Sequence, residues 1–233
     1  MTEEKNRDGL MEKLMGEMLL YGLLGKVLYA MPERSFLQSL IDEEVFNEAP
    51  FAGDEPDVIA GLELLSKWSS TNRSGISQET FLDIQAEYTR LFIGAGRVLA
   101  PVWESVYFNE ARMVFQEQTQ QVRQWYRRFG LEPEKLHAEP DDHIGLEMGF
   151  ISHLAKLALK AIDQSDDDKL EELLAAQRQF LTEHLLLWGP SWCSLVEENA
   201  RSDFYLGLGR LTLGALKGVS SWFEISLPIE KKE

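Results

Sequence analysis

Apolar residues recur every three to four positions along nearly the whole chain, which is the spacing of one face of an α-helix. The first such stripe ends before Pro32 and consists of Leu14, Met18, Tyr21, Leu24 and Leu28. No stretch of useful length alternates apolar and polar residues as a half-buried strand does, and no segment repeats another. The sequence therefore predicts an all-α fold, and its short connections favour a helical bundle with antiparallel neighbours.

The other helices are expected where apolar periodicity coincides with start and stop signals. They are predicted at residues 34–41, 58–70, 77–93, 110–129, 142–162, 166–187 and 202–223. Residues 42–57, "DEEVFNEAPFAGDEPD", hold seven acidic residues, two prolines and no basic residue, which predicts an acidic loop. We expect residues 1–233 to form a single domain, since this length suits one large core.

The chain has 39 acidic and 23 basic residues, and its formal net charge is −16. This charge argues against nucleic acid and anionic membranes as partners, because both require a basic face. The negative charge either attracts a basic ligand or only keeps the protein soluble. Cys193 is the only cysteine, so the sequence holds no disulfide framework. Because no signal peptide and no apolar span of about 20 residues is found, we expect a cytoplasmic protein without stable membrane insertion.

Motifs for catalysis or nucleotide binding are weak. The glycines at residues 94–96 follow no predicted strand, and no phosphate-binding loop is present. The histidines lack the spacing of a zinc protease. Glycines within the last predicted helix indicate close helix packing rather than a ligand site; these are Gly207, Gly209, Gly214 and Gly218.

The segment "EPDDHIGLEMGFISHLAKLA", residues 139–158, predicts a helix whose buried stripe becomes acidic at its start. An aspartate N-cap is expected after Pro140. Helical phase extends the stripe of Phe150, Leu154, Leu157 and Ala161 backwards to Glu147 and His143. A buried carboxylate costs several kcal/mol unless it is paired, so a ligand-filled cleft is one interpretation. The alternative is internal capping by Asp141 or Asp142, with His143 paired to Glu147.

A second unusual segment, "RVLAPVWESVYFNE" at residues 97–110, places one carboxylate, Glu104, among large apolar side chains. From composition alone, a buried connector with a single stray carboxylate is the favoured interpretation of this segment.

Three quoted segments together resemble the TorD/DmsD family of redox-enzyme maturation chaperones. They are "EYTRLFIGAG" (87–96), "LAPVWESVY" (99–107) and "EPDDHIGLEMGFISHL" (139–154). The family pattern is roughly E-Y-x-x-L-F-x-G-P, then A-P-P-x-E-S-V-Y, then E-P-D-D-H-I-x-x-E-L-x-F. The resemblance covers residues 10–220. Ala95 and Val102 replace prolines of the pattern and so free the backbone at these two positions.

The resemblance implies an all-helical single domain without enzymatic activity and without a cofactor of its own. It implies binding of the twin-arginine leader and the apo-form of a molybdopterin oxidoreductase, whose export is delayed until the molybdenum cofactor is inserted. It also implies a monomer or a domain-swapped dimer. The implied leader-binding residues are Trp103, Glu104, Ser105, Tyr107, Asp141, Asp142, His143 and Glu147. Residue chemistry agrees with this, because carboxylates bind guanidinium groups in bidentate fashion and an aromatic side chain such as Trp103 packs on apolar or cationic groups.

With the resemblance, we expect residues 103–107 and 141–147 to line one cleft, with Trp103 and Tyr107 as its apolar wall. The prediction fails if Glu104 lies far from His143 or is buried in an internal salt bridge.

Two other functions remain open from the sequence. One is an all-α metal-dependent enzyme that uses Asp142, His143 and Glu147 at a metal ion. The other is an assembly factor in the manner of NarJ, which would bind a mature region of its client rather than an exported leader.

Overall fold

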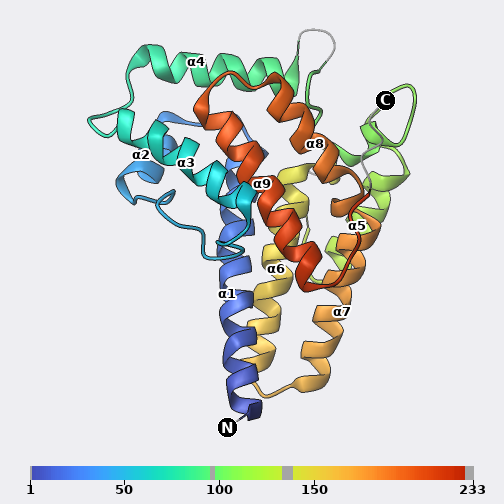
Figure 1. The fold of residues 1–233 in the computed structure, drawn as a ribbon. Helices are drawn as coiled ribbons and strands as arrows, with labels where there is room; N and C mark the ends of the chain where they lie inside the picture. The colour runs from blue at the N-terminus through green and yellow to red at the C-terminus, as the bar shows by residue number, and fades with distance from the viewer. Residues whose placement is uncertain (1, 95–97, 133–138, 229–233) are drawn as a thin grey trace. The chain divides into compact units, whose positions relative to one another are not determined.

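The computed structural model describes residues 2–94, 98–132 and 139–228, and side chains from residue 7 onward. The described residues form α-helices, two short η-helices and one isolated β-bridge, so the predicted all-α class is confirmed. The helices are α1 (Thr2–Tyr29), α2 (Arg34–Asp42), α3 (Pro56–Thr71), α4 (Gln78–Tyr88), the π-helical η1 (Thr89–Ile93), the 3-10 helix η2 (Glu104–Tyr107), α5 (Glu117–Arg128), α6 (Ile144–Asp163), α7 (Asp167–Glu183), α8 (Leu185–Asn199) and α9 (Asp203–Trp222) (Figure 1).

The chain divides into two compact units whose segments alternate along the sequence. Unit 1 contains the described parts of residues 1–29, 103–188 and 220–228, and unit 2 contains those of 30–102 and 189–219. That the two act as a single domain stays a prediction.

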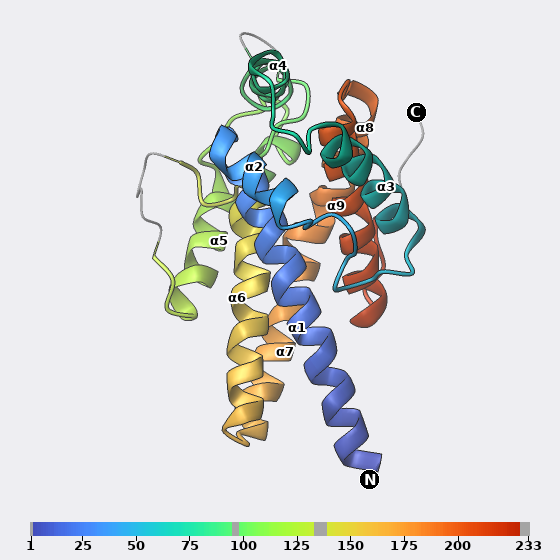
Figure 2. The same cartoon turned by 90° about the vertical axis from the view of Figure 1, so that its left-hand side faces the viewer.

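Unit 1 is built on three long helices that lie side by side, with α1 against α6 and α6 against α7 (Figures 1 and 2). Glycines allow α1 and α6 to approach closely. A Cβ atom added to Gly25 would lie 2.8 Å from the carbonyl oxygen of Gly145, and one added to Gly145 would lie 2.8 Å from that of Gly25. Because the obstructing atoms are backbone, a side chain at either position requires the helices to move apart.

The core of unit 1 contains the predicted stripes of α1 and α6, except that Met18 and Leu157 are only partly buried. It also contains a polar pair that the apolar pattern did not predict. Glu17 on α1 and Gln177 on α7 are fully buried. Neither the carboxylate of Glu17 nor the side-chain amide of Gln177 has a hydrogen-bond partner among the described residues. Burial therefore raises the pKa of Glu17 to about 8, although the nearby Gln177 amide lowers it in part.

In unit 2, α3 packs against α9 at positions where glycine is required. A Cβ atom on Gly61 would lie 2.5 Å from the backbone nitrogen of Leu211, and one on Gly214 would lie 2.5 Å from that of Val58. A Cβ atom would also lie 2.4–2.9 Å from a side-chain atom if it were added to Gly207, Gly209 or Gly218. The interpretation of close helix packing is confirmed for Gly207, Gly209 and Gly214, whereas Gly218 packs against Ala52 of the loop.

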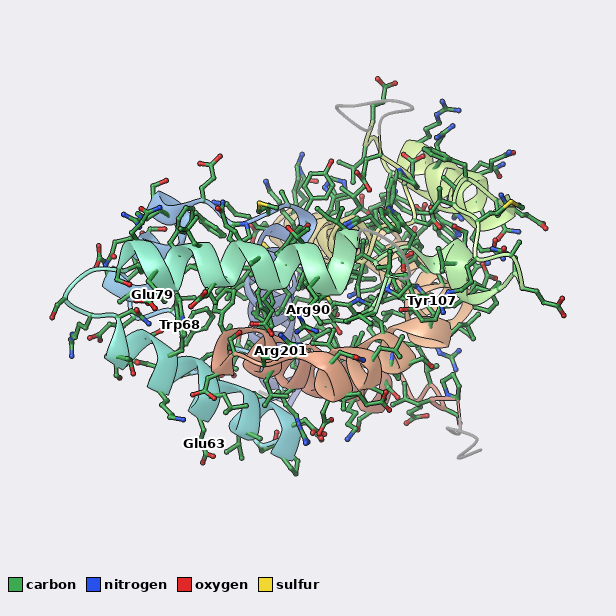
Figure 3. The ribbon with its side chains drawn as sticks, turned by 90° about the horizontal axis from the view of Figure 1, so that it is seen from above. Glu63, Trp68, Glu79, Arg90, Tyr107 and Arg201 are labelled. Carbon is green, nitrogen blue, oxygen red and sulfur yellow. The ribbon has the colours of Figure 1, made fainter. Side chains whose placement is uncertain are left out.

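The "EYTRLF" segment of unit 2 has a structural role at the start of α9. The buried carboxylate of Glu87 accepts hydrogen bonds from the backbone N–H groups of Arg201 and Ser202, which precede this helix. Arg90 donates to the carbonyl oxygen of Asn199 at 2.7 Å (Figure 3, where Arg90 and Arg201 are labelled). These bonds satisfy backbone groups that a helix end leaves without intrahelical partners.

Residues 43–55, within the expected acidic loop, form turns and bends, and α3 begins at Pro56 in the first helical position. Two aromatic side chains, Phe46 and Phe51, are buried and anchor the loop within unit 2.

Two predicted helix boundaries are wrong. The helix expected from residue 110 begins only at Glu117, because residues 108–116 form turns in which Arg112 and Phe115 adopt left-handed φ angles of 52° and 59°. The helix expected at 166–187 ends at Glu183 and is followed by α8, a separate helix that was not predicted. Proline favours a helix break at position 190, but Pro190 removes only one backbone hydrogen bond and α8 continues through it. No described helix combines the length and apolar character needed to cross a membrane.

Candidate functional site

The two segments expected to meet do so within unit 1. The backbone N–H of Glu104 donates to the carbonyl oxygen of Asp142 at 2.9 Å, and Trp103 pairs with His143 in an isolated antiparallel bridge. The Trp103 and His143 rings also contact edge to face, with centroids 6.1 Å apart. The predicted proximity of Glu104 and His143 is therefore confirmed.

Asp142 organises the polypeptide around this bridge. Its Oδ2 accepts from the backbone N–H of Ser105 at 2.8 Å, and its Oδ1 accepts from the Thr119 hydroxyl at 2.6 Å. Asp141 is paired with Arg123, whose Nε donates at 2.6 Å. Both aspartates are buried; Arg123 compensates the charge of Asp141, and hydrogen bonds satisfy both oxygens of Asp142.

The expected aspartate N-cap of α6 is wrong, because the two aspartates are engaged elsewhere. His143 is the N-cap instead, and its Nδ1 accepts the backbone N–H of Gly145 at 3.0 Å. Burial lowers the pKa of His143 to about 3, so the ring is neutral at physiological pH. A neutral ring is the form that accepts this hydrogen bond.

Glu104 is buried against His184, which belongs to none of the sequence motifs. Nδ1 of His184 lies 3.1 and 3.0 Å from the two carboxylate oxygens of Glu104. Burial raises the pKa of Glu104, and the hydrogen bond and charge of His184 oppose that rise. Glu147 accepts from the indole N–H of Trp188 at 3.2 Å, and burial beside Glu104 and Asp142 raises its pKa well above the usual value.

The expectation that Glu104 faces a cleft is therefore wrong: its carboxylate forms an internal pair with His184. Of the eight predicted site residues, Trp103 and Tyr107 keep part of their surface exposed. The other six are buried: Glu104, Ser105, Asp141, Asp142, His143 and Glu147. A partner that approaches from solvent meets the aromatic rings rather than the carboxylates. Val102, one departure from the family pattern, is buried, and Ala95, the other, lies outside the described residues.

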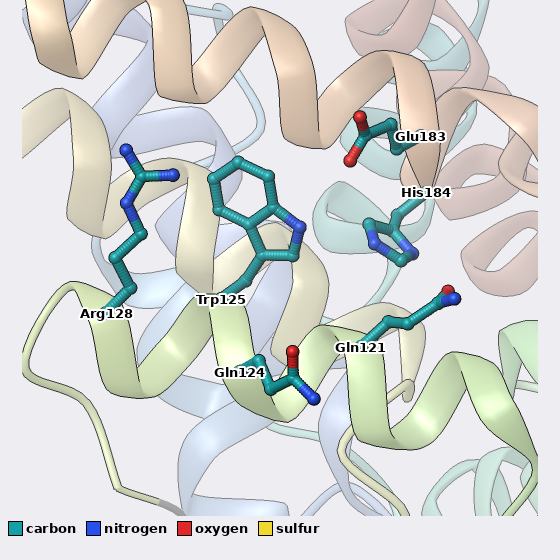
Figure 4. Close-up of a pocket in the computed structure, with 6 residues that line it drawn as sticks. All are labelled: Gln121, Gln124, Trp125, Arg128, Glu183 and His184. Carbon is teal, nitrogen blue, oxygen red and sulfur yellow. The ribbon is translucent and has the colours of Figure 1, made fainter.

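A pocket of about 440 Å³ opens beside this buried network in unit 1. Gln121, Gln124, Trp125 and Arg128 of α5 form one wall, and Glu183 and His184 at the end of α7 form the other (Figure 4). His184 thus belongs both to the pocket and to the pair with Glu104. Sequence reasoning missed the pocket because its walls are 55 or more residues apart and carry no recognised motif.

The residues proposed for a metal-dependent enzyme do not fit a metal site. Both oxygens of Asp142 and Nδ1 of His143 accept hydrogen bonds from the protein, and Glu147 accepts one from Trp188. Within the described ranges, no group of three or more His, Cys, Asp or Glu side chains is placed to hold a metal ion.

The fold and site define an all-helical protein with a buried carboxylate network beside an open pocket. The sequence model of the family described as "Nitrate reductase delta subunit" matches residues 55–194, more than half of the chain. The chain belongs to this family, which confirms the resemblance to TorD and DmsD stated from the three motifs.

Similar proteins bear chaperone names. "Chaperone protein TorD" of Aliivibrio salmonicida is 27% identical over 128 residues, which are 55% of this chain and 58% of that protein. "Probable Tat proofreading chaperone DmsD" of Haemophilus influenzae is 26% identical over 219 residues, 94% of this chain and 97% of that protein. "Tat proofreading chaperone DmsD" of Salmonella typhi is 26% identical over 193 residues, 81% of each chain. These names agree with the prediction that the chain is not an enzyme.

Proposed function

We propose that this chain is a chaperone that binds the twin-arginine signal peptide and the apo-form of a molybdopterin oxidoreductase. It delays export until the client's molybdenum cofactor is inserted, and it meets the leader in the cytoplasm. Family membership and the names of the relatives support the proposal. The observation that carries it is the convergence of residues 103–107 and 141–147, the two motif segments, in one unit.

Within this proposal the eight residues of the motifs have two roles. Trp103 and Tyr107, which are partly exposed, contact the apolar part of the leader. The buried residues hold these rings in place; they are Glu104, Ser105, Asp141, Asp142, His143 and Glu147. The net charge of −16 accelerates the encounter with a basic leader and makes binding sensitive to salt.

Calorimetry with a synthetic twin-arginine leader tests the proposal. The peptide contains two consecutive arginines followed by an apolar helical run. We expect binding that weakens with rising ionic strength and that is reduced in Trp103→Ala. Trp222→Ala is the matched control, because this ring is also partly buried in unit 1 but lies outside the motif segments. A chain that binds no leader at any salt concentration would refute the proposal.

The family description as a nitrate reductase subunit favours a second function, binding to a mature region of the client. Pull-down of full-length and leaderless client separates the two functions. Retention of the leaderless client at the same level assigns binding to the mature region, whereas its loss assigns binding to the leader.

A further inference from the structure

The wall of the pocket between α5 and α7 includes a buried histidine with a fixed orientation. His184 is 2% exposed, and Nδ1 faces both oxygens of Glu104. Nδ1 is thereby engaged with Glu104, and no hydrogen bond to Nε2, the other ring nitrogen, is found among the described residues. Nε2 is an acceptor when Nδ1 carries the proton of the ring.

Two further acceptors lie at the same end of the pocket. Glu183 accepts one hydrogen bond from Gln179 at 2.8 Å through Oε1, which leaves its Oε2 available. The amide nitrogen of Gln121 donates to Glu117 at 2.9 Å, which leaves the amide oxygen as the free atom of this group. Figure 4 shows Glu183, His184 and Gln121 at one end of the pocket, with Trp125 between them and Arg128.

The opposite end of the pocket is closed by a cation. The Arg128 guanidinium carbon lies 5.3 Å from the centroid of Trp125 and 5.1 Å from that of Phe129. The buried Trp125 supplies an apolar wall between this end and the acceptors. The arrangement therefore suits a ligand with an apolar stem and a terminal group that donates hydrogen bonds at the Glu183 end.

A guanidinium group meets these requirements, because it is a planar cation with five N–H donors and no acceptor. Lysine has the same charge, but its compact ammonium cannot donate to several acceptors in one plane. We propose that this pocket binds the guanidinium group of one arginine of the twin-arginine pair. The inference rests on the proposed function and adds to it a specific site that distinguishes arginine from lysine.

Calorimetry with the same leader tests the site through Glu183→Gln. We expect binding to weaken about tenfold, because a charge-assisted hydrogen bond becomes a neutral one. The control is Glu171→Gln, which removes the same charge from an exposed position on α7 outside the pocket. Both substitutions lie on the surface, and circular dichroism of each variant checks that it is folded. Equal affinities of the two variants would overturn the assignment.

Leader variants sharpen the test. In the wild type, replacing one of the two arginines by lysine should weaken binding more than replacing the other. In Glu183→Gln that difference should disappear, since the acceptor that recognises the guanidinium is lost. A difference that persists in Glu183→Gln overturns the pocket assignment while the proposed function stands. If the wild type binds no leader, the proposed function and this assignment are overturned together.

Arg128→Gln gives a result of opposite sign. The substitution removes a positive charge that repels the positively charged arginine of the leader. Leader binding should therefore tighten severalfold, and more so at low salt. Weaker binding in Arg128→Gln would show that the pocket prefers an anionic group, and it would overturn the proposal.

Discussion

The buried carboxyl group of Glu17 predicts that the protein becomes less stable as pH rises from about 5 to 8. In the folded protein burial raises the pKa of Glu17 to about 8, whereas the ordinary value is 4.5. Between these two values the unfolded chain has released this proton and the folded chain still holds it. Because the folded state then binds more protons than the unfolded state, the free energy of unfolding falls with rising pH.

The size of the effect follows from the two pKa values. Each pH unit between them lowers the free energy of unfolding by about 1.4 kcal/mol, and the full loss is about 5 kcal/mol. Domains are typically stable by about 5–15 kcal/mol, so this single group accounts for a large share of the total. Below pH 4.5 Glu17 is protonated in both states and has no influence on the slope.

Urea unfolding followed by circular dichroism at pH 5 to 8.5 measures this slope. Glu17→Gln keeps the shape of the side chain and cannot ionise, so its stability should decline less steeply with pH. The difference between wild type and variant should change by about 1.4 kcal/mol per pH unit. Glu12→Gln, on the exposed side of α1, is the control and should parallel the wild type. Parallel curves for wild type and Glu17→Gln would refute the reasoning.

Three substitutions test the packing and the buried bonds. Gly145→Val forces α1 away from α6 and should lower the free energy of unfolding by at least about 1–3 kcal/mol, which thermal unfolding measures. Asp142→Ala leaves the Ser105 N–H buried without its acceptor and should cost about 1–3 kcal/mol by urea unfolding. Glu87→Ala removes the acceptor at the start of α9 and should cost about 1–2 kcal/mol, and hydrogen exchange should locate the loss in the first turn of that helix.

Each of these expectations has its own contrary result. An unchanged melting temperature in Gly145→Val would mean that α1 and α6 do not touch through their backbones. Wild-type stability in Asp142→Ala would mean that water replaces the carboxylate. If hydrogen exchange in Glu87→Ala becomes faster throughout unit 2 and not only in α9, the Glu87 hydrogen bonds stabilise the whole unit rather than the start of this helix.

Sequence periodicity located most helices because burial of one helix face repeats every 3.6 residues. The helical phase of α6 also predicts that Glu147 and His143 lie on its buried side, and both side chains are buried. Most of α8 was not predicted as helix, although the loss of one hydrogen bond at Pro190 does not end this helix. It also failed at residues 110–116, whose left-handed turn conformations at Arg112 and Phe115 have no signal in those residue types.

Partners of the site residues were beyond sequence reasoning. Glu104 is held by His184, 80 positions later, at the point where α7 ends. Nothing in the residues around His184 distinguishes it from a surface histidine, so only the packed helices identify the pair. The three motifs predicted which segments meet, whereas the direction in which each carboxylate points depended on long-range contacts.

The alternation of the two units along the chain imposes an order on synthesis. α1 emerges first, but α6, against which it packs, is complete only at Asp163. At 5–20 residues per second the ribosome needs roughly 7–27 s to make the intervening chain. Throughout that interval the apolar face of α1 has no native neighbour, and the nascent chain is open to aggregation and to proteases.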